Sequence, residues 1–175
     1  IVFRTVFGNA SESLEPTASP GEVFEAVREH GFVHGFTWSH NGVGAAVAHA
    51  ALRRLQDGDL VEASARQGER LLKSLSSALA DEPSVGDVRG IGLMVGVELV
   101  ADRASKAPFP RALQTTERAV AAAREAGLLL YSSTGHVDGR DGDLVMLGPP
   151  FVISDEECDL VVERTAAAIA SLRSA

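Results

Sequence analysis

The sequence is poor in the residue types that mark several classes of protein. Its 175 residues include a single cysteine, Cys158, and only two lysines, Lys73 and Lys106. One cysteine excludes an internal disulfide, and its position in an amphipathic C-terminal stretch predicts a buried, unreactive thiol. No apolar run approaches the ~20 residues of a membrane-spanning helix, and residues 1–18 lack the basic and then apolar layout of a signal peptide. We therefore expect no membrane association and a cytoplasmic location.

Positive charge is also scarce. The chain carries 16 Lys and Arg against 24 Asp and Glu, which gives a formal net charge of −8 and a pI near 5.1. Nucleic acids attract clusters of basic residues, and no such cluster is evident here, so we predict no nucleic-acid partner. A hydrophobic content of 45% allows one or two modest cores in a chain of this length.

Metal-binding patterns are incomplete. The histidines at 30, 34, 40 and 49 have no cysteine or acidic partner at a recognisable spacing. The run 138–143 is rich in Asp and Gly, but its spacing is not that of an EF-hand. We predict a solvated loop there and no metal site.

Apolar periodicity predicts an α/β alternation after an irregular start. Helices are expected near residues 20–28, 42–57, 60–81, 111–126 and 154–173, and strands near 85–89, 92–100, 128–131 and 144–148. Leu93, Val95, Val97 and Leu99 alternate with less apolar residues, which favours a sheet with one face against helices.

Local signals mark several element boundaries. Asn41 suits an N-cap for a helix that stops near Gly58, and Ser154 with Glu157 forms a capping-box pattern. Residues 89–92 contain two glycines between strand-like runs, which predicts a tight hairpin turn rather than a dinucleotide motif. In 60–79 we expect an apolar stripe of Val61, Ala65, Gly68, Leu72, Leu75 and Leu79, with Lys73 facing water.

Three stretches, in the same order, resemble motifs of the class III aminotransferases, which are fold type I enzymes that use pyridoxal phosphate (PLP). These stretches are residues 32–41, 85–103 and 142–153. The resemblance covers roughly residues 20–175 and implies the C-terminal portion of such an enzyme: a small sheet with helices on one side and a long linking helix. It also implies that residues 1–58 are a remnant of the large PLP-binding domain and that 59–175 are the linking helix and small domain.

The resemblance assigns two cofactor contacts. Phe36 would bind the PLP phosphate of a neighbouring subunit through its backbone amide, and Thr37 through its amide and hydroxyl, so a homodimer is implied. These residues precede a helix N-terminus, where free N–H groups suit a phosphate, although a capped helix without any ligand shows the same local pattern. Gly42 departs from the family, which usually has proline there.

No catalytic residue is predicted in this chain. Transamination on PLP requires a lysine amine that holds the cofactor and moves a proton. In the family this lysine precedes the Thr37 motif, but residues 1–18 contain no lysine, and Lys73 and Lys106 lie in other contexts. We interpret the chain as a truncated or interrupted reading frame, or as one whose missing N-terminal half is another polypeptide, and expect it to be inactive alone.

Met146 is the one residue that bears on substrate. Family members that process ornithine-type substrates place arginine at this position, and a thioether cannot make the bidentate pair of guanidinium with a carboxylate. The resemblance therefore favours an ω-amine or small amino acid with a keto acid acceptor, while a core-packed Met146 is the structural alternative. A second hypothesis is a non-catalytic assembly or complementation module, because the Ala-rich helix 42–57 can approach another chain closely. A third, an unrelated α/β ligand-binding domain, requires that the predicted sheet be absent.

Overall fold

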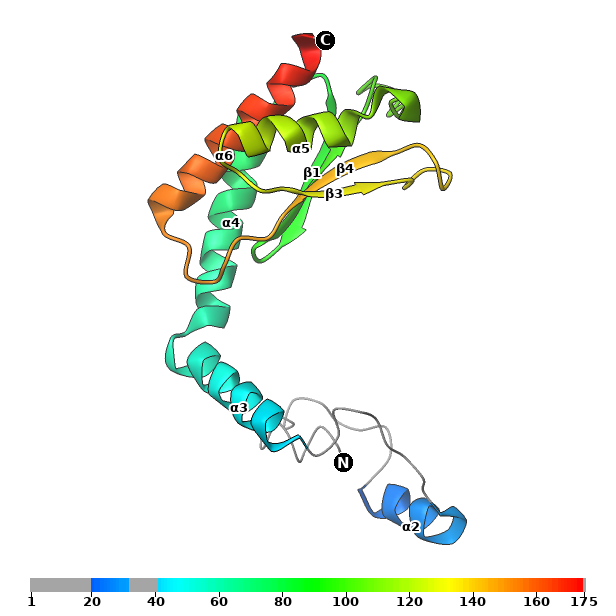
Figure 1. The fold of residues 1–175 in the computed structure, drawn as a ribbon, viewed down its shortest axis with the longest axis vertical. Helices are drawn as coiled ribbons and strands as arrows, with labels where there is room; N and C mark the ends of the chain where they lie inside the picture. The colour runs from blue at the N-terminus through cyan, green and yellow to red at the C-terminus, as the bar shows by residue number, and fades with distance from the viewer. Residues whose placement is uncertain (1–19, 32–40, 175) are drawn as a thin grey trace. The chain divides into compact units, whose positions relative to one another are not determined.

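The computed structural model describes residues 20–31 and 41–174 (Figure 1). The chain divides into two compact units, Ile1–Gly58 and Asp59–Ala175.

The first unit contains helices α2 (Pro20–His30) and α3 (Gly42–Asp57). The Asn41 side chain accepts a hydrogen bond of 2.9 Å from the Gly44 N–H, and Gly58 is the C-cap, so both predicted ends of α3 are confirmed. No residue of α3 is buried in the described chain.

The second unit is built on a four-stranded antiparallel sheet. Its strands are β1 (Val85–Ile91), β2 (Met94–Leu99), β3 (Tyr131–Thr134) and β4 (Asp143–Leu147), in the order β1-β2-β4-β3. Ile91 pairs with Met94 across a two-residue turn, and Gly92 there has φ +52°, which confirms the predicted hairpin.

Three helices cover one face of this sheet: α4 (Leu60–Ala78), α5 (Thr115–Glu125) and α6 (Asp155–Ala170) (Figure 1). Helix α4 contacts β1 and β2, α5 contacts β3 and β4, and α6 lies against α4 and α5. The predicted alternation in β2 is confirmed, because its odd-numbered residues are buried against the helices. The fully buried core includes Leu71, Leu75, Val95, Val97, Val145 and Ile169. The predicted fold class, a small sheet with helices on one side and a long helix leading into it, is confirmed.

The third strand was predicted too early, at 128–131. Its first residues instead complete the C-terminus of α5 in a Schellman motif, where Gly127 has φ +77°. The Leu128 N–H bonds to the Ala123 carbonyl at 2.8 Å, and the Gly127 N–H bonds to the Arg124 carbonyl at 2.9 Å. The run Leu128–Leu130 has the composition of a strand, but Leu128 belongs to the C-terminal cap of α5.

Helices α4 and α5 are shorter than predicted. Helix α4 ends at Ala78, and α5 begins at Thr115, because Gln114 is left-handed (φ +49°) and separates it from a short 3₁₀ helix at Arg111–Leu113. A second short 3₁₀ helix, Ser171–Ser174, follows α6.

The apolar stripe of α4 was predicted wrongly at its start and at Leu72, which is half-buried, whereas Leu71 is fully buried. Val61 is 65% exposed and Ala65 is exposed, and the buried stripe begins at Gly68. The packing partner explains this limit, since Gly68 lies directly against the backbone of Gly92 at the tip of the β1–β2 hairpin. Lys73 is exposed, as predicted.

Candidate active-site surface

Met146 lies in the middle of the sheet on the face opposite the helices. Its neighbours Val145 and Leu147 are buried against the helices, whereas Met146 itself is half-buried, as the alternation of a strand requires. In register, Gly96 of β2 flanks Met146 on one side and Tyr131 of β3 on the other. Met146 therefore belongs to an uncovered sheet surface in the described chain, and not to the core between sheet and helices.

The same row continues to Arg89 of β1, which pairs with Gly96. The Arg89 Nη1 donates to Asp87 Oδ2 and to Glu98 Oε2, both at 2.8 Å. These hydrogen bonds, first with Glu98 and then with Asp87, raise the pKa of Arg89. Two carboxylates flank one guanidinium, so its charge is more than balanced and the group carries a surplus negative charge.

Sequence reasoning missed Tyr131 and Arg89 as neighbours of Met146. Tyr131 is 70% exposed and offers a phenolic hydroxyl beside the thioether. Both residues come from other strands, so only the strand order β1-β2-β4-β3 brings them into one row. Tyr131 could have been indicated only by placing the start of β3 at residue 131, because Tyr131 would then lie in a strand of the same sheet as Met146.

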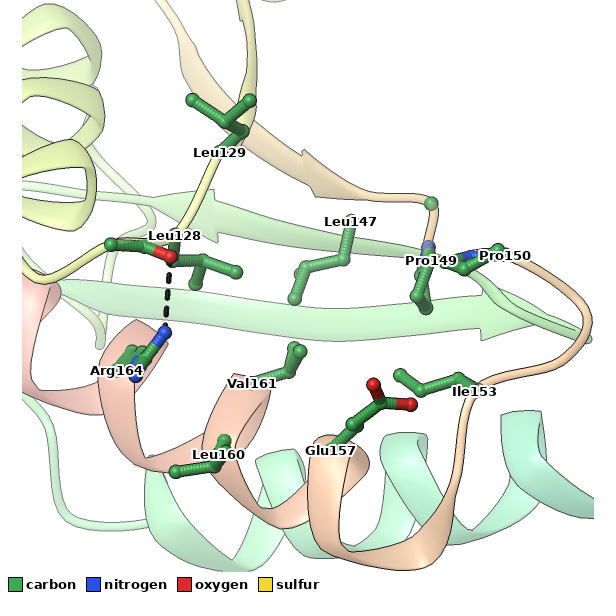
Figure 2. Close-up of a pocket in the computed structure, with 12 residues that line it drawn as sticks. Leu128, Leu129, Leu147, Pro149, Pro150, Ile153, Glu157, Leu160, Val161 and Arg164 are labelled. Atoms are coloured by element: carbon green, nitrogen blue, oxygen red, sulfur yellow. Dashed lines mark hydrogen bonds between the residues drawn. The ribbon is translucent and has the colours of Figure 1, made fainter.

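A groove of about 470 Å³ lies at the end of β4 (Figure 2). Its walls come from the turn Gly148–Pro150 after the strand, from residues 127–129 before β3, and from α6. Figure 2 shows Leu147 and Val161 pointing toward each other, with Arg164 at one end. The Arg164 Nη1 donates to the Gly127 carbonyl at 3.0 Å.

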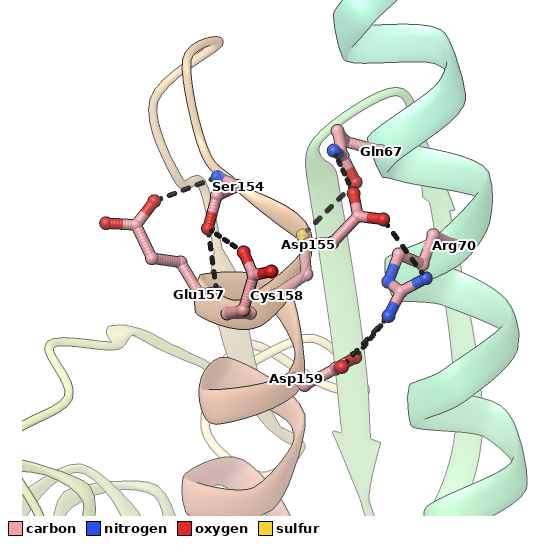
Figure 3. A network of polar contacts seen from close by, with 8 residues as sticks. Gln67, Arg70, Ser154, Asp155, Glu157, Cys158 and Asp159 are labelled. Atoms are coloured by element: carbon pink, nitrogen blue, oxygen red, sulfur yellow. Dashed lines mark hydrogen bonds and ion pairs between the residues drawn. The ribbon is translucent and has the colours of Figure 1, made fainter.

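A polar network ties the start of α6 to α4 (Figure 3). Gln67 Nε2 donates to Asp155 Oδ1 at 2.7 Å, and Arg70 Nη2 donates to both oxygens of Asp159 at 2.9 Å. Ser154 and Glu157 form the predicted capping box. Because α6 starts a few residues after the turn Gly148–Pro150, this network restrains the position of that turn.

Cys158 lies beneath the network and is 1% exposed, with its Sγ 3.6 Å from Gln67 Oε1. Burial raises the pKa of the thiol. The thiolate is the reactive form, so the prediction of a buried and unreactive cysteine agrees with this geometry.

The described residues do not form a PLP site. Lys73 is exposed on α4, and Lys106 is exposed in the loop before α5. Lys106 lines a pocket with Arg89, Glu98 and His136, but its volume is about 130 Å³, well below the ~300 Å³ at which ligand pockets begin. Phe36 and Thr37, the predicted phosphate contacts, lie outside the described residues.

The described residues form neither a metal-ligand cluster nor a membrane-spanning helix. Among residues 20–31 and 41–174, no three His, Cys, Asp or Glu side chains come together as a metal site. His34 and His40 fall outside these ranges. No helix in the described chain is long and apolar enough to cross a membrane.

The sequence is similar to those of known aminotransferases. The family model for aminotransferase class-III matches residues 9–169. The uncharacterized aminotransferase YodT of Bacillus subtilis is 36% identical over 128 residues, which are 73% of this chain and 29% of that protein. The taurine–pyruvate aminotransferase of Bilophila wadsworthia is 34% identical over 119 residues, 68% of this chain and 25% of that protein.

The fold is similar to those of solved transaminase structures. An (S)-enantioselective omega-transaminase from Thermomicrobium roseum superposes with a TM-score of 0.76 at 37% identity, over 86% of this chain and 32% of that one. A transaminase from the marine bacterium Virgibacillus gives a TM-score of 0.79 at 32% identity, over 87% and 34%. The chain thus spans between 25% and 34% of the length of these four proteins.

Proposed function

Since this chain belongs to the class III aminotransferases, we propose that it supplies the C-terminal part of a PLP-dependent enzyme that transfers an amino group from an ω-amine or small amino acid to a keto acid. The observation that carries the proposal is the joint match of sequence and fold over most of the chain. In such an enzyme PLP supplies the electron sink for the amino-group transfer.

The proposal assigns parts of this chain to parts of the complete enzyme. Residues 1–58 are a remnant of the large PLP-binding domain, and 59–175 are the linking helix and small domain. Phe36 and Thr37 bind the phosphate of the cofactor in the neighbouring subunit of a homodimer. The cofactor-holding lysine comes from outside this chain.

The surface around Met146 supports the substrate class. Along its row the one guanidinium is that of Arg89. Asp87 and Glu98 both pair with it, and the surplus negative charge of this group disfavours a second substrate carboxylate. Met146 and Tyr131 offer apolar and aromatic contact instead. The relatives named for taurine and for omega-transamination point to the same class of amine.

The isolated chain is expected to be inactive. The test is to incubate purified chain with PLP, an ω-amine and pyruvate, to measure alanine formation, and to reduce a parallel sample with borohydride before peptide mass spectrometry. We expect no turnover. We also expect no reduced PLP adduct on Lys106, so the Lys106→Arg variant should behave like the parent chain. Amine-dependent turnover by the pure chain would contradict the assignment of the cofactor lysine to another polypeptide.

A second candidate function is a non-catalytic assembly module, and exposed apolar side chains favour it. Ile91 is 84% exposed, Tyr131 70% and Met94 59%, all on the uncovered face of the sheet. Co-expression with the unmatched N-terminal part of the Bacillus subtilis relative tests this module. Stable co-purification with PLP-dependent activity that Thr37→Val reduces supports complementation. Co-purification without activity supports assembly alone.

A further inference from the structure

The groove at the end of β4 has the composition of a small-molecule site. Its walls are apolar, with Leu128, Leu147, Ile153 and Val161 among them. The volume of about 470 Å³ falls within the ~300–1,000 Å³ usual for ligand pockets. All of its lining residues belong to the second unit, so the groove does not depend on the placement of residues 1–58.

One end of the groove carries a cation without an acidic partner. Arg164 makes no ion pair with any described carboxylate, and its side chain makes one hydrogen bond to the described residues, from Nη1 to the Gly127 carbonyl. A guanidinium has five N–H donors, so four remain for a ligand. Glu157 is at the opposite end (Figure 2). One of its oxygens accepts the Ser154 N–H at 2.8 Å (Figure 3).

The spacing along α6 sets the length of the ligand. Arg164 and Glu157 are seven residues apart, which corresponds to about 10 Å of helix. Leu160 and Val161 line the stretch between them. An extended unbranched chain of about eight carbons is close to this length.

We propose that this groove binds an amphipathic carboxylate, with its carboxylate on Arg164 and its aliphatic chain against Leu147, Val161 and Ile153. The occupant is a small molecule, because the one cation of the groove lies at one end and the wall between Arg164 and Glu157 is apolar. This site is separate from the row around Met146, and it does not rest on the proposed transaminase activity.

The test is calorimetric titration of the whole chain with octanoate. Two further probes are octylamine, which lacks the carboxylate, and acetate, which lacks the long aliphatic chain. We expect octanoate to bind with a Kd on the order of 1 mM or tighter, and the other two to bind at least about tenfold more weakly. Arg164→Gln should weaken octanoate about tenfold, because a charge-assisted bidentate contact is lost.

Two variants complete the design. Arg118→Gln is the matched control, because Arg118 also donates to a backbone carbonyl, that of Leu172, and does not line the groove. Its Kd should stay within about twofold of the parent. Gly148→Leu adds a bulky side chain at a residue that lines the groove, where a Cβ meets nothing within 4 Å and so causes no clash, and should weaken octanoate binding.

Other outcomes overturn the proposal. Equal binding of octylamine, an unchanged Kd in Arg164→Gln, or no binding of octanoate at about 10 mM each excludes an amphipathic carboxylate. Sedimentation of the parent and Gly148→Leu tests the remaining occupant. Self-association that Gly148→Leu removes would show that a second copy of the chain fills the groove.

Discussion

At the scale of single residues, Gly68 sets how closely α4 approaches the sheet. A Cβ at this position would lie 2.1 Å from the carbonyl oxygen of Gly92, which is backbone and cannot rotate away. The helix can pack on the hairpin tip at this depth only because residue 68 has no side chain.

We therefore predict that Gly68→Ala lowers the free energy of unfolding by about 3 kcal/mol, through overpacking that exceeds the gain in helix propensity. Urea unfolding followed by circular dichroism measures it. Ser76→Ala is the control, because Ser76 is exposed on the same helix and its substitution should change stability by less than about 0.5 kcal/mol. A loss in Gly68→Ala no larger than that of the control would contradict the close approach.

Residue identity alone predicted some of these roles and not others. The caps at Asn41 and Ser154 and the burial of Cys158 follow from local pattern, because each depends on neighbours within a few positions in sequence. The surroundings of Met146 do not, because Gly96 and Tyr131 are brought to it by strand register. Phe36 and Thr37 stay predictions.

At the scale of elements, the N-terminus of α5 is held by a residue from β4. Its N-cap, Gln114, makes no capping hydrogen bond, and the Asp143 carboxylate takes that place. Asp143 Oδ1 accepts from the Thr116 N–H at 3.2 Å and from the Thr116 hydroxyl at 2.5 Å. Both residues are buried, at 3% and 0% exposure, so no water can replace these bonds cheaply.

Removal of this cap should lower the free energy of unfolding by more than removal of an ordinary surface cap. We expect Asp143→Ala to lower the free energy of unfolding by about 2–3 kcal/mol, because it leaves the Thr116 donors unsatisfied, and Asp143→Asn to cost about 1 kcal/mol less because an amide oxygen still accepts. Chemical denaturation gives both values.

Glu163→Ala provides the baseline for the Asp143 variants, since Glu163 is exposed on α6 and should change stability by less than about 0.5 kcal/mol. If Asp143→Asn were as damaging as Asp143→Ala, the charge of the carboxylate and not its hydrogen bonds would hold α5.

At the scale of the whole molecule, the two units differ in how they are stabilised. The second unit has a continuous core to which α4 contributes Leu71 and Leu75, and the C-cap of α4 contributes Leu79. Helix α3 of the first unit has no buried residue in the described chain. Burial of apolar surface is the main favourable term in folding, so among the described residues the second unit holds most of the stabilising core.

We predict that residues 59–175 alone unfold cooperatively, with a midpoint within about 3 °C of the whole chain. Residues 83–175 alone should fail to fold, because removal of α4 uncovers the face of β1 and β2 that it packs against. Thermal unfolding by circular dichroism, with tryptic digestion as a second readout, compares the three chains. A cooperative transition in 83–175 would contradict the role of α4.

The sequence by itself determined the order and type of the elements, their local caps and the family, because periodicity, capping and motif order are written in neighbouring residues. The tertiary structure decided which part of α4 is buried, where β3 begins, how α5 is capped and which residues surround Met146. Each of these depends on contacts between segments far apart in the chain, and the free energy of such contacts outweighs the local preferences of the residues involved.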